Sequence, residues 1–203
     1  MAEPQTLSHQ SLSATTLKPW KASRWTEAGQ ILALAEMEAA NETPVVMPPQ
    51  EYAAALFGAG LLEDSLKFTI HALPALEAAT MACYCAREVS HLEQRFLKAL
   101  EAAEAWVANP SEKRRRAAFD IAETLGFRSA ASFAALSVFW SGGSIAPEGL
   151  PPVPAPRGLF GKATYAAAML AIGSGGHIEG PMRLQRYLAW AKSMAEGNEV
   201  KAS

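Results

Sequence analysis

Cysteine is scarce in this chain, and its scarcity limits both covalent cross-linking and metal chemistry. The 203 residues contain only Cys83 and Cys85, which excludes the disulfide framework of small secreted domains and fits a reducing compartment. On a helix these two side chains would point about 200° apart, so one metal ion could not easily bind both. We therefore expect them to be small core residues, and we predict no metal site.

Long hydrophobic runs and a strong net charge are also absent. The longest apolar runs, 53–62 and 163–172, fall well short of the ~20 residues that span a bilayer. The N-terminus MAEPQTLSHQSLSATT has neither the basic nor the apolar region of a secretory signal. The formal net charge of -2 argues against an electrostatic field that attracts nucleic acid. These features predict a cytoplasmic protein that neither inserts into membranes nor binds nucleic acid.

Recognisable catalytic and cofactor motifs are lacking as well. The four histidines are scattered along the chain, and none falls in an H-E-x-x-H pattern. No G-x-S-x-G elbow is present. The glycine-rich turn 173–176 lacks both the preceding strand and the following Gly-Lys-Ser/Thr of a phosphate-binding loop. We identify no catalytic residue and no cofactor site, so the sequence favours a non-enzymatic protein.

Apolar residues at helical spacing fill most of the chain. Half of all residues are hydrophobic, which is enough for a substantial core. In one typical segment Ser129 is a preferred N-cap residue, and Phe133, Leu136 and Trp140 follow it on a single helical face. The pattern therefore predicts an all-α protein.

Residues 23–197 are predicted to form a single helical domain of about eight helices, since short turns separate the periodic segments and favour antiparallel hairpins. The hairpins could close into a bundle or stack into a short HEAT-like solenoid, because no repeat period is visible. Residues 1–22 and 198–203 are expected to form flexible tails.

The segment 74–89 is the candidate central helix. Pro74 suits a first helical turn, and the residues after it are small or apolar on nearly every side. A helix that is apolar all round has to be covered all round. We therefore expect its neighbours in the sequence to pack on both of its sides.

A proline-rich arm at residues 139–156, FWSGGSIAPEGLPPVPAP, is the most distinctive stretch of the chain. Its two glycines are expected to end the preceding helix, because glycine enters the left-handed conformation at low cost. The prolines after them favour an extended chain, since proline fixes φ and lacks a backbone donor. The candidate interaction or strap residues are Trp140, Gly142, Gly143, Pro147, Pro151, Pro152, Val153, Pro154 and Pro156.

Two interpretations of the arm are open. In the first, the arm is a strap whose Leu150 and Val153 pack on Trp140 and on neighbouring helices, because such side chains are usually buried. In the second, the arm is a free proline-rich ligand for a partner protein. The sequence favours the strap.

A basic run lies ahead of the arm and consists of Lys113, Arg114, Arg115 and Arg116. Such a run could dock a partner, but acidic residues surround it. Glu112 and Arg116, for example, have the i, i+4 spacing of an ordinary surface ion pair. We expect a solvated helix face here, with a basic docking face as the alternative.

Four blocks of the sequence resemble an uncharacterised bacterial family of unknown function. These blocks are ACYCAR (82–87), AEAWVANPSEKRRRAAF (103–119), FWSGGSIAP (139–147) and PPVPAP (151–156). Some members of that family are similar to proteins encoded near type VI secretion loci. The resemblance implies a helical fold and a bacterial origin, and it transfers no activity or catalytic residue to this chain.

Two functional hypotheses follow from these observations. The leading one is a non-enzymatic adaptor or accessory protein, in the setting of a bacterial secretion system, that binds another protein through a helical groove or the arm. The alternative is a small-molecule enzyme or binding domain with an aromatic pocket lined by Trp140, Tyr84 and Trp106.

Overall fold

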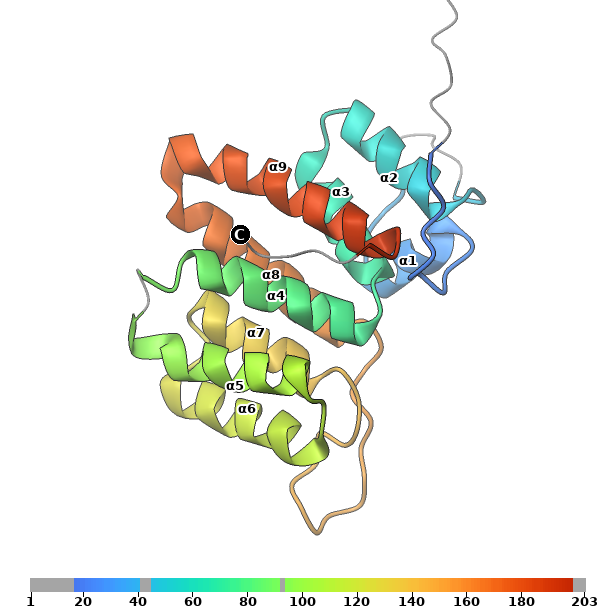
Figure 1. The fold of residues 1–203 in the computed structure, drawn as a ribbon. Helices are drawn as coiled ribbons and strands as arrows, with labels where there is room; N and C mark the ends of the chain where they lie inside the picture. The colour runs from blue at the N-terminus through green and yellow to red at the C-terminus, as the bar shows by residue number, and fades with distance from the viewer. Residues whose placement is uncertain (1–16, 41–44, 92–93, 199–203) are drawn as a thin grey trace, which may run out of the picture.

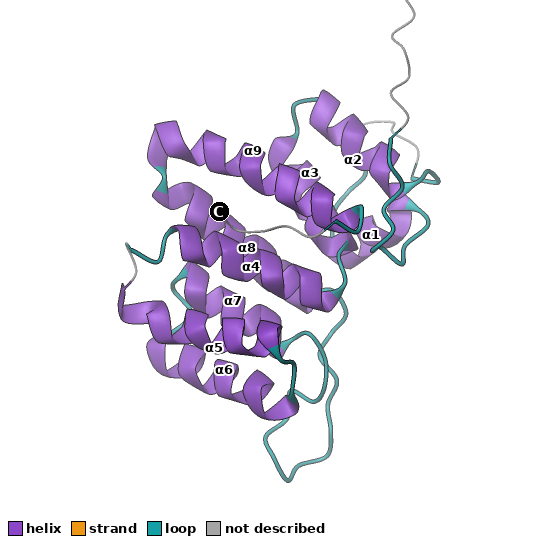
Figure 2. Ribbon diagram, viewed as in Figure 1, coloured by secondary structure: helices purple, strands orange, loops and turns teal. Residues whose placement is uncertain are grey.

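The computed structural model describes residues 17–40, 45–91 and 94–198, and the regular secondary structure of these residues is helical (Figures 1 and 2). The helices are α1 (Ala28–Ala35), α2 (Pro49–Gly58), α3 (Leu62–Ala72), α4 (Ala75–Glu88), α5 (Leu97–Ala108), α6 (Glu112–Leu125), α7 (Ala130–Phe139), α8 (Leu159–Ser174) and α9 (Gly176–Ala195). A short 3-10 turn, η1 (Gln94–Phe96), leads into α5. The predicted all-α fold is confirmed, and the described residues contain nine α-helices rather than about eight.

Helix α7 lies at the centre of the fold. It contacts α4, α5, α6 and α8, and nine of its ten residues are buried. Its small residues let the surrounding helices approach closely. The Ser137 hydroxyl lies 2.8 Å from the Thr164 hydroxyl of α8, so this buried polar group is satisfied. The helix that leads into the arm is therefore fixed from every side.

Helix α4 is also central, as predicted, but it is not covered all round. It contacts α5, α7, α8 and α9, and its small residues, Cys83 and Cys85 included, are buried. Leu76 and Arg87 on its outer side are exposed. Complete coverage was therefore a wrong prediction, because one stripe of the helix faces solvent.

The helices form a bundle rather than a solenoid. Helix α3 packs against α8 and α9, and α4 packs against α7 and α8, which are far away in the sequence. In a solenoid each repeat contacts only its sequence neighbours. The hairpin α5/α6 and helix α9 lie on opposite sides of α4 (Figure 1). No helix in the described part of the chain has the length and hydropathy needed to cross a bilayer.

Part of the predicted N-terminal tail packs on the bundle. Trp20 is buried, and the centre of its ring lies 6.2 Å from that of Phe68 on α3. This contact fixes the chain from residue 17 onward against the helices. Residues 1–16 and 199–203, which make up the rest of the predicted tails, lie outside the described residues.

Candidate functional site

Arg115 of α6 holds the base of the arm. Its guanidinium donates to the carbonyl oxygen of Phe139, at the end of α7, and to that of Ser144 at 2.7 Å. It also donates to the two carboxylate oxygens of Glu112, from Nε at 2.7 Å and from Nη2 at 2.8 Å. Only 3% of Arg115 is exposed. The planar guanidinium thus connects α6, α7 and the arm from a buried position.

An aromatic stack supports this guanidinium. The Arg115 side chain lies over the ring of Phe139, 4.7 Å from its centre. The ring of Phe139 stacks in turn on Phe119 of α6, with 4.2 Å between the centres. A cation over an aromatic face is attracted by the ring quadrupole. Phe139 therefore serves both as a core residue and as a platform for Arg115.

Arg116 makes a second set of contacts to the arm. It donates to the carbonyl oxygens of Ala146 at 3.0 Å and Ser144 at 3.3 Å. Its Nε also donates to Glu112 at 2.8 Å, so this one carboxylate pairs with both arginines. The hydrogen bond from Arg115 is the main reason why the pKa of Glu112 is lowered to about 2. We call Glu112, Arg115 and Arg116 the arginine anchor.

Gly143 lets the chain pass close to the arginine anchor. Its φ is +66°, and a Cβ at this position would lie 2.9 Å from Arg115 Nη2 and 3.0 Å from Glu112 Oε2. Any larger residue would therefore meet both backbone strain and a steric clash. At Gly142 a Cβ would meet nothing within 4 Å. The predicted need for glycine thus applies to Gly143 and not to Gly142.

The base of the arm is a narrow hairpin closed by backbone contacts. Ser144 and Pro154 form an isolated antiparallel bridge, and the Ile145 N–H donates to the Val153 carbonyl at 2.8 Å. The Ser144 hydroxyl accepts the Val153 N–H at 3.0 Å. These bonds bring the outgoing and returning chains together at Ser144, whose carbonyl the arginine anchor binds.

A tight turn forms the tip of the arm. The Leu150 N–H donates to the Pro147 carbonyl at 3.3 Å, and Gly149 between them has a φ of +85°. A left-handed residue in the third position is characteristic of a type II turn, where glycine is preferred. In Figure 1 this part of the chain, between α7 and α8, projects beyond the end of α6.

The apolar side chains of the arm face solvent, which contradicts the packing expected of a strap. Leu150 is 60% exposed and Val153 48% exposed, while Trp140 is half-buried at the end of α7. The exposed prolines are Pro147, Pro151, Pro152, Pro154 and Pro156. The expected burial is wrong because main-chain carbonyls bound by the arginines hold the arm in place, and its side chains are left outside.

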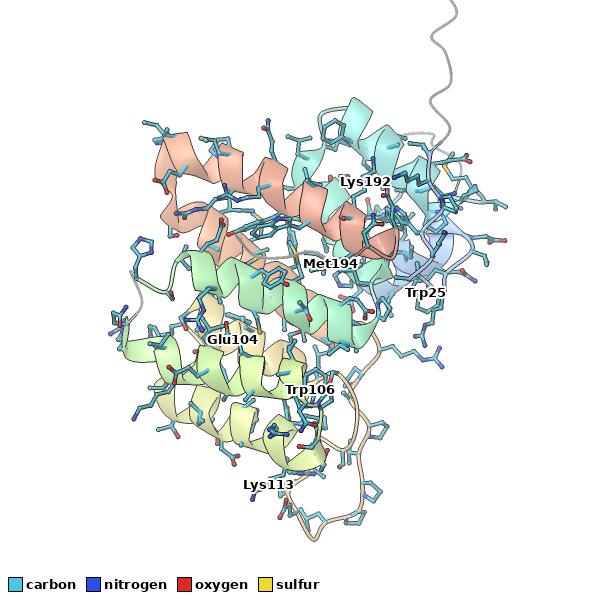
Figure 3. All side chains as sticks on the ribbon, in the orientation of Figure 1. Trp25, Glu104, Trp106, Lys113, Lys192 and Met194 are labelled. Atoms are coloured by element: carbon cyan, nitrogen blue, oxygen red, sulfur yellow. The ribbon has the colours of Figure 1, made fainter. Side chains whose placement is uncertain are left out.

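The basic run divides into two unequal halves. Lys113 and Arg114 are exposed, and Figure 3 shows Lys113 at the outer end of α6. Arg115 is buried and Arg116 is half-buried. The prediction of a solvated face is therefore wrong for the second half, since the helix turns these two residues toward α7 and the arm. The predicted pair between Glu112 and Arg116 is confirmed.

The three aromatic residues of the alternative hypothesis come from α4, α5 and the end of α7. The ring of Tyr84 packs edge-on against Trp190 of α9, 5.7 Å between centres. Trp106 is buried on α5, and Trp140 ends α7. A groove of about 590 Å³ lies instead between α2, α3 and α9, and none of the three residues lines it. Its lining belongs to elements that the sequence did not single out.

Three buried titratable groups, Cys83, Cys85 and His71, have pKa values that keep them neutral. Burial raises the pKa of Cys83 and Cys85 far above the usual thiol value, so the nucleophilic thiolate is suppressed. Burial lowers the pKa of His71 to about 4. Across residues 17–40, 45–91 and 94–198, no three His, Cys, Asp or Glu side chains are grouped so that they could hold a metal ion.

Fold and contacts together define an all-α bundle that presents an exposed arm on a buried arginine anchor. The chain belongs to a family of unknown function, DUF6931, whose sequence model matches residues 52–195. The matched region contains the arm and the whole arginine anchor. Comparison with the curated proteins and with the solved structures found no match.

Proposed function

We propose that this protein is a non-enzymatic adaptor or accessory protein that binds another protein through the tip of the arm. One combination of features carries the proposal: the base of the arm is held by a buried arginine, while its apolar tip is exposed. Arg115 binds the main chain of the base, and Leu150 and Val153 face solvent. Burial of a charged side chain costs desolvation free energy. Because the buried arginine keeps an apolar loop exposed to solvent, we infer that this loop is a recognition surface.

The arm is conformationally preorganised for binding. Its hairpin bonds, its type II turn and its prolines restrict the conformations that the free chain can adopt. A preorganised loop loses less conformational entropy on association than a disordered one. An extended proline-rich segment with apolar side chains between the prolines fits an apolar, aromatic-lined groove on a partner.

Two exposed cations lie next to the base of the arm and extend the proposed surface. Lys113 and Arg114 precede the buried arginine on the same helix and are solvent-exposed. We assign to these two residues the basic docking face that the sequence offered as an alternative for the whole run. A partner with acidic residues around its apolar groove would complement them, mainly by speeding association.

The proposal also includes a cellular setting, namely the cytoplasm and a bacterial secretion system. The scarcity of cysteine, with both thiols buried, supports a reducing compartment. The resemblance of the arm and basic-run blocks to an uncharacterised bacterial family supports the secretion setting.

Quantitative affinity purification of the tagged full chain from its native cell tests the proposal. The arm variant Leu150→Ser/Val153→Ser removes two exposed apolar side chains of the arm, one at its tip and one at its base. Its matched control is Ile178→Ser/Met182→Ser, which removes two side chains on α9 that are 80% and 61% exposed. We expect a stoichiometric partner to be recovered with wild type and control, and to fall at least about tenfold with the arm variant. Equal recovery with both variants, or no partner with wild type, would contradict the proposal.

A further inference from the structure

The groove between α2, α3 and α9 has the form of a ligand site. It encloses about 590 Å³, within the range of ~300–1,000 Å³ that is typical of small-molecule sites. Helices α2 and α9 both pack on α3, and they form the two walls of the groove. Ser65 and Thr69 of α3 contribute to the lining between them. Leu17, Lys18 and Trp20 complete the lining, and the ring of Trp20 lies against Phe68 of α3.

Each wall of the groove is a regular helical face. Helix α2 contributes Gln50, Ala53, Ala54 and Phe57, which recur at i, i+3, i+4 and i+7. Helix α9 contributes Gln185, Leu188, Ala189 and Lys192 at the same spacing. Small and apolar side chains occupy the middle of both faces. Over seven residues a wall extends about 10 Å, so the groove is an apolar slot about two turns long.

The charged side chains in the lining of this slot are positive. The lining includes Lys18 and Lys192 and no acidic residue. The segment that follows Lys18 joins the C-terminal end of α9, where the Ala22 N–H donates to the Ala195 carbonyl at 3.0 Å. Among the residues that the structure describes, neither lysine forms an ion pair. Figure 3 shows Lys192 on the side of α9 that faces α2.

The volume of the groove, about 590 Å³, lies within the range of small-molecule sites, and its length of about two helical turns suits a slender apolar ligand. Ser65 and Thr69 direct their hydroxyl protons to the carbonyls of Ala53 and Ser65, so the floor offers acceptors rather than donors. An anionic head group is therefore expected at the lysines and not at the floor.

We propose that this groove binds a fatty acid, with its alkyl chain along Ala54, Phe57 and Leu188 and its carboxylate at Lys18 and Lys192. The apolar walls bury the chain, which is the main source of affinity. The two ammonium groups select an anionic head group over a cationic one. This site is independent of the arm and of the partner proposed for it.

Isothermal titration calorimetry of the full chain with dodecanoate, below its micelle concentration, tests the inference. Dodecyltrimethylammonium has the same chain and the opposite charge, so it measures the selection made by the lysines. We expect saturable binding of dodecanoate that is at least about tenfold tighter than binding of the cationic amphiphile. Vesicles of phosphatidylglycerol distinguish a free fatty acid from a membrane surface, and we expect weaker binding to them.

Matched variants locate the site. Ala54→Trp fills the groove, whereas Ala55→Trp places the same side chain on the exposed neighbouring position of α2. Ala189→Trp fills the groove from the opposite wall, so the conclusion does not depend on the correct folding of a single variant. We expect both filling variants to lose dodecanoate binding at least about tenfold while Ala55→Trp retains it.

The head-group contact has its own variant and control. Lys18→Glu/Lys192→Glu should reverse the preference between the two amphiphiles, whereas Lys98→Glu/Arg128→Glu, on exposed positions of α5 and of the loop before α7, should leave it unchanged. The inference is wrong if wild type shows no saturable heat with dodecanoate, or if it binds both amphiphiles equally. Binding of phosphatidylglycerol vesicles or of an acidic amphipathic peptide in place of dodecanoate would also overturn it.

Discussion

Replacement of Arg115 by methionine should destabilise the end of α7 and release the arm. Methionine keeps an unbranched apolar stem of similar length but removes every donor. The buried Phe139 carbonyl then loses the hydrogen bond from Arg115, while Ser144 keeps only its 3.3 Å bond from Arg116. A hydrogen bond from a charged donor contributes about 1.5–3 kcal/mol. Glu112 is half-exposed and can return to water, so we expect a loss of about 2–4 kcal/mol in the free energy of unfolding.

Urea denaturation followed by circular dichroism measures this loss, and limited proteolysis reports on the arm. The matched control is Lys113→Met, which makes the same change two residues earlier on an exposed position. We expect the control to lie within about 0.5 kcal/mol of wild type. We also expect cleavage between residues 144 and 157 to accelerate only in the Arg115 variant. Similar unfolding free energies and cleavage rates for the two variants would refute the role assigned to the arginine anchor.

Three further results are expected. Gly143→Val should destabilise the protein by more than 1 kcal/mol and speed cleavage of the arm, whereas Gly142→Val should do neither; equal effects in urea titrations and digests would count against the close approach. Ala82→Asp should cost several kcal/mol because it buries an unpaired charge in α4, and an unchanged thermal melt would place Ala82 outside the core. The free energy of unfolding should fall on the order of 3 kcal/mol as the pH drops from about 6.5 to about 4, because the unfolded chain binds a proton at His71 at a higher pH than the folded protein does. In urea titrations at several pH values, His71→Gln should lack this contribution to the pH dependence.

Helical periodicity and capping residues predicted much of the fold. Ser129 accepts the Ser132 N–H at 3.0 Å and begins α7, as its side chain suggested. The segment 74–89 is central because its alanines and cysteines fit between several helices. Local chemistry determines both features, so they could be inferred without knowledge of the packing partners.

The inward direction of Arg115 was missed, although the sequence contains a signal for it. Arg115 lies three residues before Ala118 and seven before Ala122, and these three residues form the buried stripe of α6. Charge alone groups Lys113 to Arg116 into one unit. Periodicity, applied residue by residue, separates Arg115 from the exposed Lys113 and Arg114.

Two other features depend on contacts that no local pattern contains. The exposure of Leu150 and Val153 follows from backbone hydrogen bonds between the outgoing and returning chains of the arm and from the contacts that the arginines of α6 make with its carbonyls. The groove arises where α2 and α9, more than a hundred residues apart, pack on the same helix. Composition predicts that apolar residues are buried on average, but the tertiary arrangement decides which ones remain outside.

Site-specific photo-crosslinking in the native cell tests directly whether the tip of the arm binds a partner protein. A photoreactive amino acid at Leu150 reports on the tip, and the same residue at Ile178 reports on an exposed apolar position of α9. We expect one discrete crosslinked protein from position 150, which disappears when Arg115→Met releases the arm, and none of that mass from position 178. No adduct at position 150, or the same adduct from both positions, would contradict binding at the tip.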